Sequence, residues 1–113
     1  MSISTHILDT AIGRPAAGVP VTLARAGEGN RWAILNRMQT DADGRCRPLL
    51  PVDEAMTPGL YAIRFDTEAY YGKQGLRGLY PYVEIAFLVE AGEAHYHIPL
   101  LLTANGYTTY RGS

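Results

Sequence analysis

The chain has 113 residues, of which 47% are hydrophobic and 19% charged, as expected for one ordinary globular domain spanning residues 1–113. Its net charge is −1, and basic and acidic residues are mixed along the sequence. The sequence therefore lacks the basic stripe that nucleic-acid binding requires. Its apolar runs are far shorter than the roughly 20 residues of a membrane span, so we expect no membrane partner.

The sequence contains a single cysteine, Cys46, which excludes an intrachain disulfide framework. The first residues lead directly into a strand pattern, without the basic and apolar regions of a secretory signal. Both observations favour a cytoplasmic protein.

The first half of the chain is patterned as short strands separated by turn-forming residues. Apolar and polar side chains alternate within each segment, as they do in strands with one buried face. Gly27 to Asn30 is typical of a hairpin turn. The strands predicted in this half are 5–9, 19–25, 31–39 and 45–50.

The second half has the clearest strand, 60–66, in which Tyr61, Ile63 and Phe65 are predicted to face the core. A short helix from Glu68 to Tyr71, capped by Asp66 or Thr67, is the only helical signal. Further strands are predicted at 82–90, 95–102 and 107–111. Seven to eight short strands separated by turn signals indicate an all-β sandwich.

The strand at 95–102 has an unusual outer face. Tyr96, Ile98, Leu100 and Leu102 alternate onto one face, which is the obvious core face. The other face carries His95, His97, Pro99 and Leu101, and half of it is apolar. A strand with one solvated face would carry polar residues there, so we expect this face to be covered by a second surface.

Two histidines, His6 and His97, lie in predicted strands on partly apolar faces. A lone histidine in such a place is most often structural, but these two accompany Arg45, which follows an Asp-Gly turn, and a polar C-terminal segment. Histidine titrates near neutrality and can take a proton from water, whereas arginine binds a carbonyl oxygen or developing negative charge. These groups suffice to hydrolyse a cyclic amide without a metal or a cofactor.

Other kinds of site have weaker support. His95 and His97 share a strand face and His6 is a conceivable third zinc ligand, but the carboxylate and cysteine patterns of zinc sites are missing. His95 itself is expected to be a surface or strand-end residue. Cys46 is a conceivable nucleophile, but a lone cysteine in a short strand is far more often a packed side chain.

Four motifs, STHILD, TDADGR, HYHIPLLL and the C-terminal YRGS, occur in order between Thr5 and Ser113. Together they resemble the transthyretin-like 5-hydroxyisourate hydrolases. The resemblance implies an all-β sandwich of two four-stranded sheets with one short helix. It also implies a homotetramer, with active sites in channels where dimers meet.

By the same resemblance, His6, Arg45, His97 and Ser113 are expected to be catalytic, and Tyr110, Arg111 and Gly112 to bind substrate. The implied reaction is metal-free hydrolysis of 5-hydroxyisourate to 2-oxo-4-hydroxy-4-carboxy-5-ureidoimidazoline in urate degradation. His6 or His97 is the expected general base, and Arg45 the clamp for substrate and oxyanion. Ser113 and Arg111 are expected to position substrate or water.

Two alternatives belong to other classes. A non-catalytic carrier of the transthyretin type would use the same channel for a small ligand, but would be expected to lack both histidines, Arg45 and the YRGS motif. An adhesion module would present a polar outer face from His97 to Leu101. The pattern disfavours both.

Overall fold

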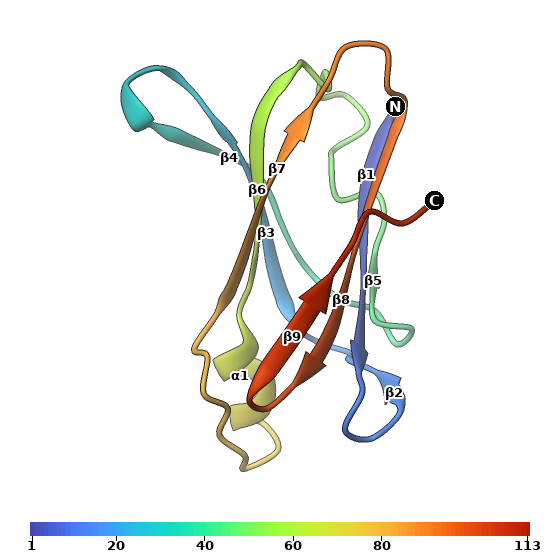
Figure 1. Cartoon of the computed structure of the whole chain (residues 1–113), viewed down its shortest axis with the longest axis vertical. Helices are drawn as coiled ribbons and strands as arrows, with labels where there is room; N and C mark the ends of the chain where they lie inside the picture. Colours follow the sequence, from blue (N-terminus) through green and yellow to red (C-terminus); the bar gives the residue numbers. More distant parts are fainter.

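The computed structural model describes all 113 residues, which form two β-sheets packed face to face (Figure 1). The first sheet contains β1 (Ser2–Asp9), β2 (Arg14–Pro15), β5 (Arg45–Cys46), β8 (His95–Thr103) and β9 (Gly106–Thr109). The second contains β3 (Pro20–Ala26), β4 (Trp32–Gln39), β6 (Gly59–Phe65) and β7 (Val83–Val89). The helices are α1 (Thr67–Gly72) and a 3-10 turn, η1 (Glu28–Asn30), between β3 and β4.

The predicted all-β sandwich of two sheets with one short helix is confirmed, although the first sheet has five strands rather than the four expected. Strands follow the order β2-β1-β8-β9 in the first sheet, where β5 also pairs with β1, and β4-β3-β6-β7 in the second. α1 lies at the lower end of the sandwich in Figure 1. Asp66 caps it by accepting a hydrogen bond from the backbone N–H of Ala69 at 3.1 Å. No helix has both the length and the apolar character that crossing a membrane requires.

The core lies between the inner faces of the two sheets. Tyr61, Ile63 and Phe65 of β6 are fully buried, as their alternation predicts, and the four predicted inward residues of β8 are also buried. Burial of each such side chain stabilises the fold by about 1.5–3 kcal/mol. Because these inner side chains fix the rotation of each strand, they also determine which residues the outer faces present.

The strand predicted from Arg45 to Leu50 is wrong beyond Cys46. Only Arg45 and Cys46 pair with β1. Pro48 has no N–H to offer a ladder, and the chain turns inward so that Leu49 and Leu50 are buried. The backbone N–H of Leu49 donates instead to the carbonyl of Ile3 at 2.9 Å.

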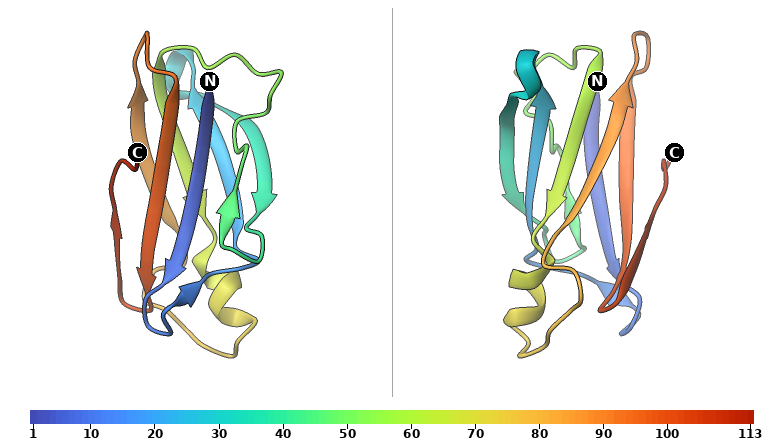
Figure 2. Two further views of the ribbon diagram at one scale, coloured as in Figure 1. Left: turned by 90° about the vertical axis from the view of Figure 1, so that its right-hand side faces the viewer. Right: turned by 60° about the vertical axis from the view of Figure 1, so that its left-hand side comes forward.

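β1 is longer than predicted and runs from Ser2 rather than Thr5. It pairs in parallel with β8, and Ser2, Ser4 and His6 lie opposite His95, His97 and Pro99, respectively. Figure 2 shows these two strands lying along each other through the length of the sheet. β5 flanks the other side of β1 and places Arg45 opposite His6. This register assembles one polar outer face from three segments that are distant in sequence.

Candidate active site

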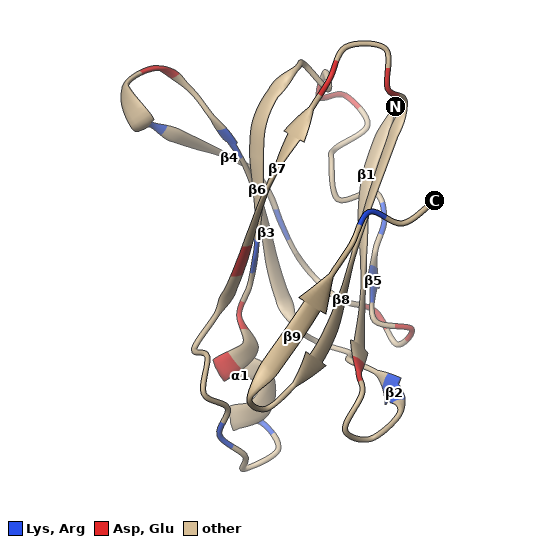
Figure 3. Cartoon of the chain, in the orientation of Figure 1, with Lys and Arg blue, Asp and Glu red and all other residues tan.

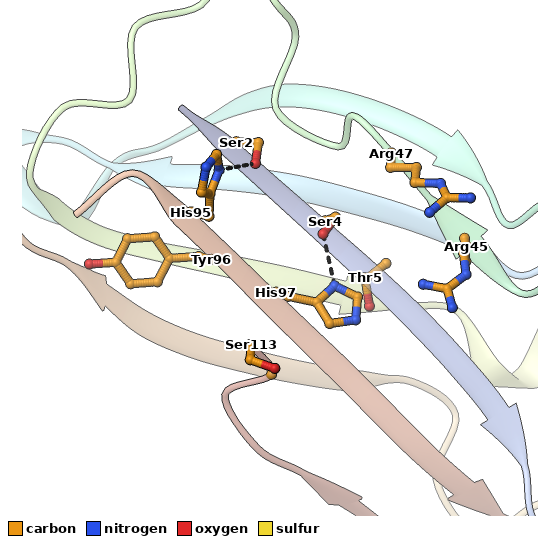
Figure 4. Close-up of a pocket in the computed structure, with 10 residues that line it drawn as sticks. Ser2, Ser4, Thr5, Arg45, Arg47, His95, Tyr96, His97 and Ser113 are labelled. Atoms are coloured by element: carbon orange, nitrogen blue, oxygen red, sulfur yellow. Dashed lines mark hydrogen bonds between the residues drawn. The ribbon is translucent and has the colours of Figure 1, made fainter.

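A cavity of about 300 Å³ opens on the outer face of the first sheet, and Tyr96 is its one apolar lining residue. Figure 4 shows that its lining residues come from β1, β8, the segment at β5 and the C-terminal tail. The lining residues are Ser2, Ser4, Thr5, Arg45, Arg47, His95, Tyr96, His97, Gly112 and Ser113. Such a cavity suits a small polar ligand better than an apolar one.

The His97 ring is held from two sides. Its Nδ1 atom lies 2.8 Å from the Ser4 hydroxyl, at hydrogen-bond distance (Figure 4). On another side the tail runs against it, and the Gly112 N–H donates to the His97 carbonyl at 2.7 Å. A Cβ atom on Gly112 would lie only 2.6 Å from Cδ2 of the ring, so only glycine fits here without displacement.

The environment of both predicted histidines favours the neutral imidazole. Burial lowers the pKa of His97, and the positive charges of Arg45 and Arg47, together with that of His6 when it is protonated, lower it further. Burial and the charge of Arg45 lower the pKa of His6, although a hydrogen bond to the Asp43 backbone opposes this shift. Both rings are therefore available at neutral pH to accept a proton. His6 shares the outer face with His97 but does not line the cavity.

A tight turn places Arg45. The Asp41 carboxylate accepts hydrogen bonds from the backbone N–H groups of Asp43, at 2.9 Å, and Arg45, at 3.0 Å. Gly44 adopts φ +75°, and a Cβ there would collide with the carbonyl of Ile7. The turn thus docks closely on β1, which explains the Asp-Ala-Asp-Gly-Arg motif as a device that sets Arg45 opposite His6.

The tail divides into two parts. Gly112 and Ser113 line the cavity. Arg111 does not line it: its guanidinium stacks 4.3 Å from the centroid of the Tyr96 ring, pairs with Glu93 at 3.5 Å and donates to the His95 carbonyl at 3.1 Å. Tyr110 is 56% exposed and lies outside the cavity as well. Arg111 thus anchors the tail in this chain, and substrate binding by Arg111 and Tyr110 stays a prediction.

Several lining residues were not anticipated. Ser4 lies two positions before His6, so strand alternation puts both on one face. Its pairing with His97 depends on the register between β1 and β8, which no local pattern contains. Arg47 lay within a predicted strand, two positions beyond Arg45. In a strand this spacing puts both side chains on one face, and it was the signal from which Arg47 could have been found. His95 is exposed as expected, and its Nδ1 atom lies 2.8 Å from the Ser2 hydroxyl.

Neither the metal alternative nor the cysteine alternative gains support. No three residues among the histidines, cysteine and acidic residues come together as a possible metal site. Cys46 is fully buried, with its Cα opposite that of the buried Thr5, and burial raises the pKa of its thiol to about 11. A protonated thiol in the core is a packed side chain rather than a nucleophile.

Comparison with known protein families gives one match over nearly the whole chain. The family described as Transthyretin, HIUase/Transthyretin family, matches residues 3–112. A 5-hydroxyisourate hydrolase of Mus musculus is 43% identical over 112 residues, covering 98% of this chain and 94% of the mouse protein.

Two solved structures share the fold. The structure of Klebsiella pneumoniae 5-hydroxyisourate hydrolase has a TM-score of 0.84 and 34% identity, covering 99% of this chain and 93% of that one. Sea bream transthyretin in complex with thyroxine has a TM-score of 0.91 and 29% identity, with coverage of 99% and 95%. Similarity of fold therefore does not separate a hydrolase from a thyroxine-binding protein, and the side chains of the site must do so.

Proposed function

This chain belongs to the HIUase/Transthyretin family, and from that premise we propose that it hydrolyses 5-hydroxyisourate to 2-oxo-4-hydroxy-4-carboxy-5-ureidoimidazoline. The observation that supports this most is the register of β1 with β8 and β5. It brings His6, His97 and Arg45 onto one face, beside a cavity that Ser113 also lines.

In the proposed reaction a water molecule attacks a ring carbonyl, and a C–N bond of the six-membered ring opens. His6 or His97 accepts the proton of the water, since both rings have pKa values below the ordinary 6.5 and are neutral at pH 7. Arg45 holds the ring and stabilises the oxyanion through its guanidinium N–H groups. Ser113 positions the substrate or the water from the tail.

The carrier alternative rests on the similarity to sea bream transthyretin. A ligand carrier needs apolar surface in its cavity. The cavity here is instead lined by serines, histidines and arginines, with Tyr96 as its one apolar residue. The chemistry of the cavity thus favours hydrolysis over carriage.

The decisive measurement is the decay of freshly generated 5-hydroxyisourate, followed by absorbance, with the wild type and His97→Asn. Asparagine keeps hydrogen-bonding groups at this position but cannot take up a proton at neutral pH. We expect the wild type to accelerate decay by orders of magnitude and the variant to lose at least about a hundredfold of that activity.

Buffer alone and heat-denatured protein are the controls. A wild-type protein that leaves the decay unchanged would refute the proposed reaction, and attention would turn to ligand binding in the same cavity. Homotetramer assembly, the single domain at 1–113 and the cytoplasmic location remain predictions.

A further inference from the structure

We propose that Arg47 is a second cationic residue of the site and that it binds the carboxylate created when the substrate ring opens. The inference rests on the proposed function and adds a residue and a charge requirement to it. Arg47 was not among the residues expected from sequence.

Arg45 and Arg47 present their side chains to the same cavity. Arg45 lies in β5 and Arg47 follows that strand, while Cys46 between them is fully buried in the core. Both arginines line the cavity, on its β5 side, where Figure 4 shows their side chains. Figure 3 shows basic residues both at β5 and in the segment that follows it.

Neither guanidinium is neutralised within the chain. The two ion pairs of the structure are Arg25 with Glu54 and Arg111 with Glu93, and no side-chain hydrogen bond involves the guanidinium of Arg45 or Arg47. The Oδ1 atom of the nearby Asp41 accepts hydrogen bonds from the backbone N–H groups of Arg45 and Asp43, which lower the pKa of this carboxyl, and the positive charges of Arg47 and Arg45 lower it further. Asp41 forms no ion pair with either guanidinium.

The charges of both arginines also reach the reacting groups. Both lower the pKa of His97. No aspartate or glutamate lines the cavity. A cavity lined by two arginine cations, by His97 with its lowered pKa and by no aspartate or glutamate attracts anions and stabilises negative charge that develops inside it.

The reaction produces such a charge. The oxygen of the water bonds to the ring carbonyl carbon, the C–N bond breaks, and the departing nitrogen takes up a proton. The new carboxylic acid then loses its proton at neutral pH, so the product carries one more negative charge than the substrate. Arg45, opposite His6, is placed for the reacting carbonyl. Arg47, two positions further along, is placed to accept the carboxylate through its planar fork of N–H donors.

The test compares wild type with Arg47→Gln and Arg47→Lys, and uses Arg37→Gln as the matched control. Arg37 is an exposed arginine of the second sheet and does not line the cavity. Orotate, a planar cyclic amide that carries a carboxylate, is the anionic probe, and uracil is its counterpart without the carboxylate. Binding is measured by titration calorimetry, and folding of each variant by circular dichroism.

We expect wild type and Arg37→Gln to bind orotate more tightly than uracil. Arg47→Gln should lose roughly tenfold to a hundredfold of orotate affinity, with uracil affinity unchanged, as expected for the loss of a charge-assisted hydrogen bond. Arg47→Lys should retain part of the preference, because it keeps the charge without the planar fork. Competitive inhibition of hydrolysis by orotate should weaken in the same order.

Equal orotate preference in wild type and Arg47→Gln would overturn the proposal, as would a wild type that does not distinguish orotate from uracil. The outcome is separable from that of the proposed function. If wild type does not hydrolyse 5-hydroxyisourate but Arg47 controls orotate binding, the reaction is wrong and the anion site stands.

Discussion

At the scale of single residues, His6 and His97 make activity depend on pH in a predictable direction. Both pKa values lie below the ordinary 6.5, and catalysis requires a neutral ring. We therefore expect the acid limb of kcat/KM to have its midpoint below pH 6.5. A pH profile of 5-hydroxyisourate decay, corrected for the spontaneous reaction, tests this. An acid limb with its midpoint at or above 6.5 would contradict it.

The lowered pKa values of His6 and His97 also make the stability of the fold depend on pH, which gives a second test of the same pKa shifts. The unfolded chain takes up protons on these histidines near pH 6.5, while the folded chain resists protonation. Their contribution to the free energy of unfolding is thus constant above that pH and decreases as the pH falls below it. Thermal unfolding measures this effect. The decrease in Tm between neutral pH and a pH below 6.5 should be smaller in His97→Asn than in the wild type.

Residue roles were predictable from the sequence to different degrees. Alternation alone indicates which side chains of β6 and β8 face the core, since the period of a strand is fixed by backbone geometry. That His6, Arg45 and His97 belong to one site came from the resemblance of motifs. The contact between Ser4 and His97 could not be predicted, because these residues are 93 positions apart and meet only through the register of β1 with β8.

At the scale of elements, the C-terminal tail packs against His97 and limits where its ring can lie. We predict that Gly112→Ala lowers kcat/KM by about a hundredfold, because the added Cβ would lie 2.6 Å from the imidazole and must displace the ring or the tail. Tm should change little, since the tail lies on the surface and contributes little to the core. The two quantities are measured by the absorbance assay and by thermal unfolding.

Gly72→Ala is the matched control for this substitution. Gly72 ends α1, and a Cβ there would have no atom within 4 Å. This control should keep full activity. If Gly112→Ala is equally active, the tail does not position His97.

Elements also show where the sequence was a poor guide. The segment from Arg45 to Leu50 has the apolar content of a strand, yet only its first two residues pair with β1. Burial of Leu49 and Leu50 outweighs further pairing, and Pro48 lacks the donor that pairing requires. The sequence indicates the Asp-Gly turn before this segment, but not where that turn packs. Its docking on Ile7 depends on a tertiary contact and on the left-handed backbone of Gly44.

At the scale of the whole molecule, we predict that the outer face of the first sheet is covered by another copy of the chain. Pro99 is already buried and Leu101 is partly buried, while the neighbouring Tyr107 and Tyr110 remain exposed. Sedimentation analysis should give a species of four times the 12.4 kDa of one chain at the concentrations used for the assay. A monomer that retains full activity would refute a site shared between subunits.

The arrangement of β1 also determines the order in which the molecule can be completed. β1 is synthesised before every other strand, whereas its parallel partner β8 comes late and only β9 follows it; paired residues of β1 and β8 are 93 positions apart. Until then one edge of β1 has no partner strand, and such edges invite pairing with other chains. Closing so long a loop is slow. Until β8 is made, the strand that carries His6 is therefore the part of the nascent chain most exposed to aggregation. We expect the yield of soluble protein to depend most on how fast the last part of the chain, with β8, is synthesised and paired.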